Sequence, residues 1–141
     1  MKAPLKPIIL RGKDSTGNGW FGASRGNRKH EGVDFVGVPG QNVYACESGR
    51  VRIGNVYRGS TKMKLVEIKN STYKVKQMYV QPTVKNGQMV QAGDVIGTLQ
   101  DVATFHGSNK MKPHCHISVW KNGLLTDPEP IIVPCKCLNP F

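Results

Sequence analysis

The sequence predicts a mainly β fold built around a small antiparallel sheet, and three observations support this. The chain has 141 residues, which is enough for one domain. From Asn42 onward, runs rich in Val, Ile and Tyr are each bounded by Gly, Asn, Ser or Pro. The 16 Gly and 9 Pro are spread along the chain and favour short strands and turns. A helical bundle, a coiled coil and a disordered tail are therefore disfavoured.

The expected strands follow one another along the chain, at residues 42–47, 49–57, 62–70, 72–80, 94–100 and 114–120. Turn residues separate them at 47–49, 70–72 and 121–123, and Asn122-Gly123 supplies the positive φ angles of a tight hairpin. The first 29 residues are rich in Gly, Ser and Asn near their end and predict a loop-like arm laid over the sheet. We expect an N-terminal arm (1–20), a β domain (21–130) and a C-terminal tail (131–141).

The charge balance predicts an anionic partner. There are 20 Lys and Arg against 9 Asp and Glu, giving a formal charge of +11. The basic residues are scattered rather than gathered on one helix, which argues against nucleic acid, and those from Lys62 to Lys76 are expected on a solvated strand face. No apolar stretch approaches the roughly 18–20 residues of a membrane span. We expect a soluble monomer, with no signal peptide at its N-terminus.

Four cysteines, at positions 46, 115, 135 and 137, leave the redox compartment open. They could form two disulfides, but their density is far below that of a disulfide scaffold. The Cys135-Lys136-Cys137 run lacks the second pair that a closed tetrahedral thiolate site needs. The cysteines therefore do not decide the function.

Three of the four histidines stand in patterns typical of metal sites. His30 and Asp34 are four residues apart, so a turn or strand edge can aim an imidazole and a carboxylate at one point. His114 and His116 alternate with Cys115 in a strand-like run, which places both imidazoles on one face and the thiol in the core. A single histidine is more often an ordinary surface or core residue. Together, His30, Asp34 and His116 would leave a fourth position open for water, as in catalytic zinc sites.

An ordered series of motifs runs from about Phe21 to Pro128: HEGVDF, VYACESGRV, VKNGQMVQAGDVIGTLQ, PHCHISVWKNG and Thr126-Asp127-Pro128. This series resembles the lysostaphin/LytM-type zinc endopeptidases, which cleave peptidoglycan cross-bridges. The resemblance implies a small antiparallel β-sheet or sandwich groove with one zinc ion at its floor. It also implies that His30, Asp34 and His116 are the zinc ligands, and that His114 contacts the attacking water or the developing oxyanion.

Gln81 departs from the family pattern. The family has tyrosine, a small residue and then a second catalytic histidine, whereas this chain has Tyr79-Val80-Gln81-Pro82. Glutamine donates hydrogen bonds but cannot shuttle a proton, so assistance worth roughly 10²–10⁴ in rate would be lost or supplied elsewhere. The leukocyte chemotaxin branch, which resembles these peptidases and is regarded as non-peptidase, shares this pattern.

Other side chains complete the expected site. Gln81 or Tyr79 would help to bind the oxyanion. His106, on the loop before the HxH strand, either swings toward the zinc and replaces the missing acid–base group or is an exposed loop histidine. A set of residues that precede His30 are candidate substrate contacts: Trp20, Phe21, Arg25 and Arg28. Alternatively, the two arginines are ordinary solvated charges of the arm, and an aromatic residue anchors the arm to the core.

Two functions of different class follow. The first is a zinc metalloprotease, a hydrolase of peptidoglycan stems or cross-bridges in the bacterial cell wall. The second is a catalytically impaired, chemotaxin-like zinc domain that binds a wall component, a glycan or a receptor. A lytic module of a virion or secretion machine is a third. The intact ligand set favours the enzyme, acting on peptidoglycan or another anionic wall polymer in a secreted, periplasmic or virion-associated setting.

Overall fold

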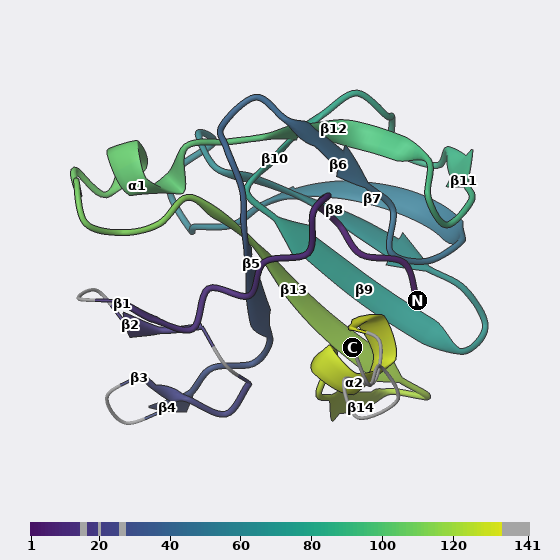
Figure 1. Cartoon of the computed structure of the whole chain (residues 1–141). Coiled ribbons are helices and arrows are strands. Elements are labelled where there is room, and N and C mark those ends of the chain that lie inside the picture. Colours follow the sequence, from purple (N-terminus) through teal and green to yellow (C-terminus); the bar gives the residue numbers. More distant parts are fainter. Residues whose placement is uncertain (15–16, 20, 26–27, 134–141) are drawn as a thin grey trace.

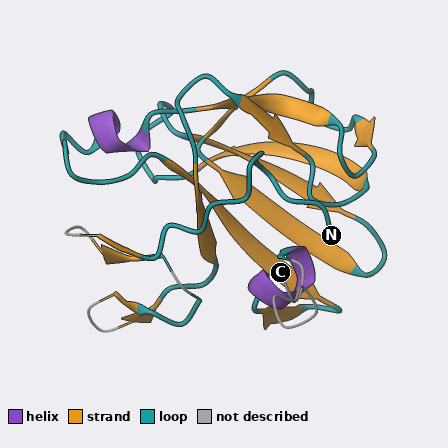
Figure 2. Cartoon of the chain, in the orientation of Figure 1, coloured by secondary structure: helices purple, strands orange, loops and turns teal. Residues whose placement is uncertain are grey.

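The computed structural model describes residues 1–14, 17–19, 21–25 and 28–133, and strands dominate this part of the chain (Figures 1 and 2). Its two helices each span one turn, α1 (Val102–Phe105) and α2 (Glu129–Ile132). Neither is long and apolar enough to cross a membrane. The strands are β1 (Lys13–Asp14), β2 (Gly17–Asn18), β3 (Ser24–Arg25), β4 (Arg28–Lys29), β5 (Val33–Val36), β6 (Asn42–Tyr44), β7 (Gly49–Asn55), β8 (Lys64–Lys69), β9 (Tyr73–Met78), β10 (Val80–Pro82), β11 (Met89–Val90), β12 (Val95–Leu99), β13 (His114–Lys121) and β14 (Leu124–Thr126). All of their pairings are antiparallel, so the predicted fold class is confirmed.

The larger sheet has seven strands and carries the candidate site. Its main order is β11-β7-β8-β9-β13-β14, and β5 pairs with the first half of β13. On β13, Cys115, Ile117 and Val119 are fully buried in the core, whereas the alternate positions begin with His114 and His116. This is the period-2 arrangement expected for the HxH strand. The second imidazole thus lies where β5, β13 and β9 meet.

A smaller sheet of order β10-β12-β6 shares the hydrophobic core with the larger one. Gln77 is a fully buried polar residue between them. Its Nε2 donates to the carbonyl of Tyr44 at 2.9 Å, and its Oε1 accepts from the N–H of Cys46 at 2.8 Å. Because Gln77 belongs to the larger sheet and Tyr44 to the smaller one, this amide joins the two sheets and satisfies backbone groups that would otherwise be buried unpaired.

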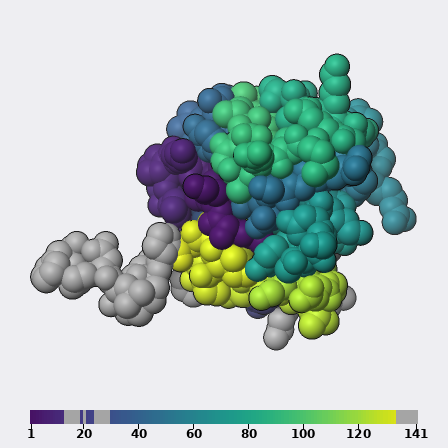
Figure 3. All heavy atoms as spheres, turned by 90° about the vertical axis from the view of Figure 1, so that its right-hand side faces the viewer, coloured from purple at the N-terminus to yellow at the C-terminus, as the bar shows by residue number. Residues whose placement is uncertain are grey.

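The N-terminal segment is anchored at its start and folded into hairpins further on. Leu5 is completely buried in the core, and the Met1 ammonium donates to the carbonyl of Ile131 at 3.1 Å. Figure 3 shows this purple segment beside the yellow C-terminal one. The Gly-, Ser- and Asn-rich region contains two short hairpins, β1–β2 and β3–β4, within the expected loop-like arm. The domain boundaries at residues 20 and 130 stay a prediction, and Cys135 and Cys137 lie outside the described residues.

The expected strand over residues 72–80 is divided at Tyr79. This residue has a φ of 71°, a left-handed conformation that bulky side chains rarely adopt. As a result β9 ends in the larger sheet at Met78, and β10 starts in the smaller sheet at Val80. Tyr79 and Gln81 therefore have different surroundings, although two-residue spacing in one strand would have placed them on the same face.

Two of the three predicted turns form hairpins, and the third connects strands of different sheets. Asn122 and Gly123 have positive φ and connect the β13–β14 hairpin, and Asn70 caps the β8–β9 turn by accepting from the N–H groups of Thr72 and Tyr73. The turn at 47–49 instead connects β6 and β7, which belong to different sheets. A turn motif specifies a local reversal, but the partner of each strand depends on the packing of the whole core.

Candidate metal centre

Three side chains converge at the junction of β5 and β13. His30 Nε2 lies 2.8 Å from His116 Nδ1, and Asp34 Oδ1 lies 3.0 Å from that same nitrogen and 3.3 Å from His30 Nε2. The potential ligand atoms all lie within 4.8 Å of one another. Two imidazole nitrogens and one carboxylate oxygen are a donor set suited to zinc. The structure thus brings together the three residues that the sequence proposed as ligands.

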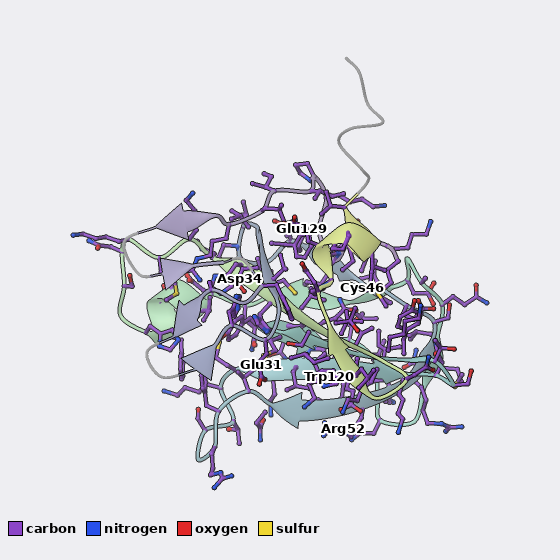
Figure 4. The ribbon with its side chains drawn as sticks, turned by 90° about the horizontal axis from the view of Figure 1, so that it is seen from below. Glu31, Asp34, Cys46, Arg52, Trp120 and Glu129 are labelled. Atoms are coloured by element: carbon purple, nitrogen blue, oxygen red, sulfur yellow. The ribbon has the colours of Figure 1, made fainter. Side chains whose placement is uncertain are left out.

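Strand register explains this convergence. Asp34 and His116 are directly opposite each other in the β5–β13 pair, and Figure 4 shows Asp34 within the fold. Gly32 provides the necessary space, because a Cβ there would lie 2.7 Å from His116 Nε2 and overlap the carbonyl of Ile117. His30 is held in the preceding segment through its backbone, which pairs with Gly22 and Ala23. The HxxxD spacing therefore works because a glycine allows the backbone to pass close to the imidazole.

Two further side chains orient the ligands. Ser118 Oγ lies 2.8 Å from His116 Nε2, which leaves the Nδ1 of that ring for a metal. Arg11 Nη1 donates to Asp34 Oδ2 at 2.9 Å, and both side chains are almost fully buried. Neither residue was a sequence candidate. Ser118 could have been found from strand parity, since it is two residues after His116, but no pattern in the sequence connects Arg11 to Asp34.

Asp34 is ionised despite its burial. Burial raises the pKa of this carboxyl, but hydrogen bonds from His116 and His30, together with nearby His114, hold the pKa well below its usual range. A carboxylate is the form that binds a metal ion. The protein therefore maintains Asp34 in its ligating state.

His114 presents a basic nitrogen to the cluster. Its Nδ1 lies 2.7 Å from the carbonyl oxygen of Lys112, which can only accept, so Nδ1 carries the proton. In the neutral ring Nε2 is then unprotonated, and it lies 3.7 Å from Asp34 Oδ2. Burial lowers the pKa of His114, which favours the neutral ring. This arrangement suits a general base beside the ligands.

A chain of three polar side chains approaches His114 from the other side. The hydroxyl oxygens of Tyr79 and Tyr57 are 3.0 Å apart, and the Tyr57 hydroxyl lies 2.9 Å from His106 Nε2. The Tyr79 and His114 rings pack edge to face, with their centres 5.4 Å apart. Burial raises the pKa of Tyr79, so its hydroxyl stays protonated. The sequence pointed to Tyr79 and His106 but not to Tyr57, which connects them.

The comparison with known families decides what this site belongs to. The sequence profile of peptidase family M23 matches residues 28–128, most of the chain. The chain belongs to this family. The matched segment includes the three candidate metal ligands, His114 and the Tyr57–His106 pair, so the geometry above is that of an M23 domain.

Two curated relatives are similar to this M23 chain. Myeloid protein 1 of Gallus gallus is 35% identical over 95 residues, which are 64% of this chain and 29% of that protein. Leukocyte cell-derived chemotaxin-2 of Bos taurus is 28% identical over 122 residues, which are 84% of this chain and 76% of that protein. The chain thus spans less than a third of the length of the first relative.

Solved structures share the fold. Csd3 of Helicobacter pylori has a TM-score of 0.69 and 24% identity, covering 96% of this chain and 33% of that chain. The catalytic domain of lysostaphin, an antimicrobial peptidase of Staphylococcus simulans, has a TM-score of 0.61 and 25% identity. The match covers 85% of this chain and 91% of the lysostaphin domain. The M23 architecture is therefore supported by both sequence and shape.

The remaining sequence candidates lie at different places around this M23 site. The groove over the cluster has a volume of about 540 Å³, and Tyr79, His106 and His114 are among its lining residues. Gln81 is exposed outside that lining, with its Oε1 3.4 Å from Gln100 Nε2. The structure thus places Tyr79, and not Gln81, beside the catalytic histidine candidate.

The candidate substrate contacts precede His30. Arg25 and Arg28 are paired in the β3–β4 hairpin, but their side chains lie outside the described part, as does Trp20. Phe21 is half-buried and packs against the core. This position agrees with the role of an aromatic anchor, which was the alternative to a substrate contact. The contact role of the two arginines stays a prediction.

Proposed function

We propose that this chain is a zinc-dependent endopeptidase that hydrolyses peptide bonds in bacterial peptidoglycan stems or cross-bridges, outside the cytoplasmic membrane. The observation that carries the proposal is the His30, Asp34 and His116 donor set with the unprotonated Nε2 of His114 beside it. The M23 family match and the similarity to an antimicrobial peptidase support the reaction class. The excess of positive charge suits an anionic wall polymer.

Zinc held by the three ligands would supply Lewis-acid polarisation of the scissile carbonyl and would lower the pKa of a water molecule towards neutral pH. His114 accepts the proton from the attacking water at Nε2 and then delivers it to the leaving amine. Its Nδ1–H bond to the Lys112 carbonyl holds the ring in the required tautomer and stabilises the imidazolium that forms. One histidine thereby performs both proton transfers.

The Tyr79 hydroxyl provides a hydrogen-bond donor for the developing oxyanion. When His106 Nε2 donates to Tyr57 and Tyr57 donates to Tyr79, the proton of Tyr79 is left to point into the groove. Gln81, at the position of the family's second histidine, is exposed outside the groove. Tyr79, oriented by Tyr57 and His106, therefore supplies the oxyanion contact, and proton shuttling falls to His114.

A zymogram on purified peptidoglycan, combined with zinc quantification, tests the proposal. Wild type is expected to bind about one zinc per chain and to clear the gel, whereas His114→Ala should bind zinc and lose at least 10²-fold in rate. Gln81→His should change neither property, because residue 81 is exposed outside the groove. Zinc binding without clearing by wild type, with clearing gained by Gln81→His, would reject the enzyme.

His106 needs a separate measurement, because its groove position does not distinguish orientation from proton transfer. We expect His106→Ala to lower kcat by less than His114→Ala does, since it acts through Tyr57. His106→Asn can still donate a hydrogen bond and should restore part of the loss. An unchanged kcat in His106→Ala would show that His106 has no role in catalysis and is an ordinary loop histidine.

The second candidate is a zinc-containing binding domain without peptidase activity. The specific observation in its favour is the similarity to leukocyte cell-derived chemotaxin-2, combined with glutamine at the position of the family's second histidine. Such a domain would bind a wall component, a glycan or a receptor. It predicts retention on insoluble peptidoglycan without release of soluble fragments, which the same preparation can measure.

A further inference from the structure

A basic and aromatic cluster continues the floor of the groove away from the metal ligands. On the exposed face of the larger sheet, the Nζ of Lys74 lies 4.5 Å from the centre of the Trp120 ring, and that of Lys76 lies 5.4 Å from it. Lys74 is directly opposite Trp120, and Lys76 is opposite Ser118. Figure 4 shows Trp120 and Arg52 on strands of this sheet. Two ammonium groups thus lie close to the same indole ring.

This cluster is continuous with the candidate active site. Lys76, Ser118 and Trp120 line the same groove as His116. His116, Ser118 and Trp120 occupy alternate positions of β13, so Trp120 is about 13 Å along the strand from the metal ligand at about 3.3 Å per residue. An extended peptide bound at the metal centre covers that distance in about four residues. The cluster is therefore within reach of the same substrate chain.

The two ammonium groups have no carboxylate partner within the described residues. The neighbouring acid on the sheet, Glu67, is engaged by Arg52, whose Nη2 lies 2.6 Å from Glu67 Oε2. Both lysines are half-buried, which reduces the screening of their charge by solvent. An anionic group on the bound chain would supply the missing counter-charge.

We infer that Lys74, Lys76 and Trp120 form a substrate subsite for a carboxylate about three to four residues from the cleaved bond. This inference rests on the proposed function, because it names the chemistry of the substrate of that groove. The carboxylate either belongs to an acidic side chain or is the C-terminus of the peptide. In both cases the ammonium groups bind the carboxylate while the indole supports the adjacent apolar atoms.

Fluorescence anisotropy with synthetic peptides tests the subsite independently of catalysis. The probes are dansylated heptaglycine peptides with a Glu or a Gln at one of the last four positions, each with a free or an amidated C-terminus. They are titrated with the zinc-loaded full chain carrying His114→Ala, so that the peptide stays intact. We expect an acidic probe to bind about three- to tenfold more tightly than its neutral counterpart, as two partly exposed charge contacts allow. The side-chain and C-terminal arms show which carboxylate is bound.

Matched variants locate the effect. Adding Lys74→Gln and Lys76→Gln should remove the preference for the acidic probe, whereas Lys85→Gln, a charge change on an exposed turn outside the groove, should leave it intact. Thermal unfolding checks that each variant is folded. Equal binding of acidic and neutral probes, or a preference that survives the double substitution, overturns the subsite. A clear preference for the acidic probe, when the wild-type chain releases no fragments from peptidoglycan, would reject the peptidase while supporting the subsite.

Discussion

Replacing Arg11 by methionine should be among the most destabilising single changes that leave the metal ligands in place. The Arg11–Asp34 pair has a 2.9 Å contact, with side chains 5% and 2% exposed. Breaking one partner of such a pair typically costs about 3–5 kcal/mol, because the other charge stays buried. Asp34 Oδ1 retains its contacts with His116 and His30, so the lower end, about 3 kcal/mol, is expected.

The matched control is Arg52→Met. The Arg52–Glu67 pair is shorter, at 2.6 Å, but its arginine side chain is 56% exposed. An exposed pair contributes about 0–1 kcal/mol. At about 3–4 °C per kcal/mol for a chain of this length, zinc-free Arg11→Met should melt about 10 °C below wild type and Arg52→Met within about 4 °C of it.

Differential scanning calorimetry of the zinc-free chain measures both changes. Burial, and not contact length, is expected to set the loss of stability, so the order of the two variants is the decisive result. Equal losses, or a larger loss for Arg52→Met, would refute it. Raising the salt concentration should affect the control pair more, since a buried pair is screened less.

Four other outcomes are expected. Gly32→Ala should weaken zinc affinity by about tenfold or more, measured by competition with a chromophoric chelator, because the added Cβ meets His116. Tyr79→Phe should lower kcat on peptidoglycan about 10²-fold with little change in KM, because only the proposed oxyanion donor is lost. Asp101→Ala should cost about 0.5–1 kcal/mol in urea unfolding at pH 7, because it removes the caps on the backbone N–H and hydroxyl of Thr104. These bonds lower the pKa of Asp101, so the difference from wild type should be full above about pH 4 and disappear as pH falls through the lowered pKa. Binding to insoluble peptidoglycan should weaken steeply with salt, given the charge of +11.

Each of these has a contrary result. Gly54→Ala adds a Cβ with its nearest contact at 3.3 Å, so a loss of zinc equal to that of Gly32→Ala would show a general effect of alanine. Full activity in Tyr79→Phe would remove the hydroxyl from the mechanism. A pH-independent effect of Asp101→Ala would mean that the charge of the cap is unimportant. Wall binding that is insensitive to salt would limit the positive charge to a role in solubility.

The metal ligands could be predicted because local geometry determines much of their arrangement. The HxxxD and HxH spacings placed His30, Asp34, His114 and His116 in compatible orientations, and strand parity correctly assigned Cys115 to the core. The same parity reaches Ser118. His114, His116 and Ser118 alternate along β13, and His30 lies in the segment just before β5, which contains Asp34, so each spacing is contained in one short segment.

Arg11 and Tyr57 could not be predicted for the opposite reason. Arg11 is 23 residues from Asp34, and Tyr57 is 49 residues from His106, so only the assembled sheets bring them together. The separation of Tyr79 from Gln81 depends on a positive φ at a tyrosine, which propensity does not indicate. That one dihedral angle determines which of the two side chains faces the groove.

The buried amide of Gln77 has a consequence for how a substrate enters. Its donor faces a carbonyl and its acceptor faces an N–H, so sliding one sheet over the other would break both bonds inside the core. Movement of one sheet against the other would therefore cost both of these hydrogen bonds, which favours a groove of constant width. The segment around α1 and the N-terminal hairpins lie on the same side of the molecule (Figure 1), and His106 and His30, which adjoin them, line the groove. We therefore expect access to depend on these segments, and exchanging them with the sheets untouched would test which polymers can enter.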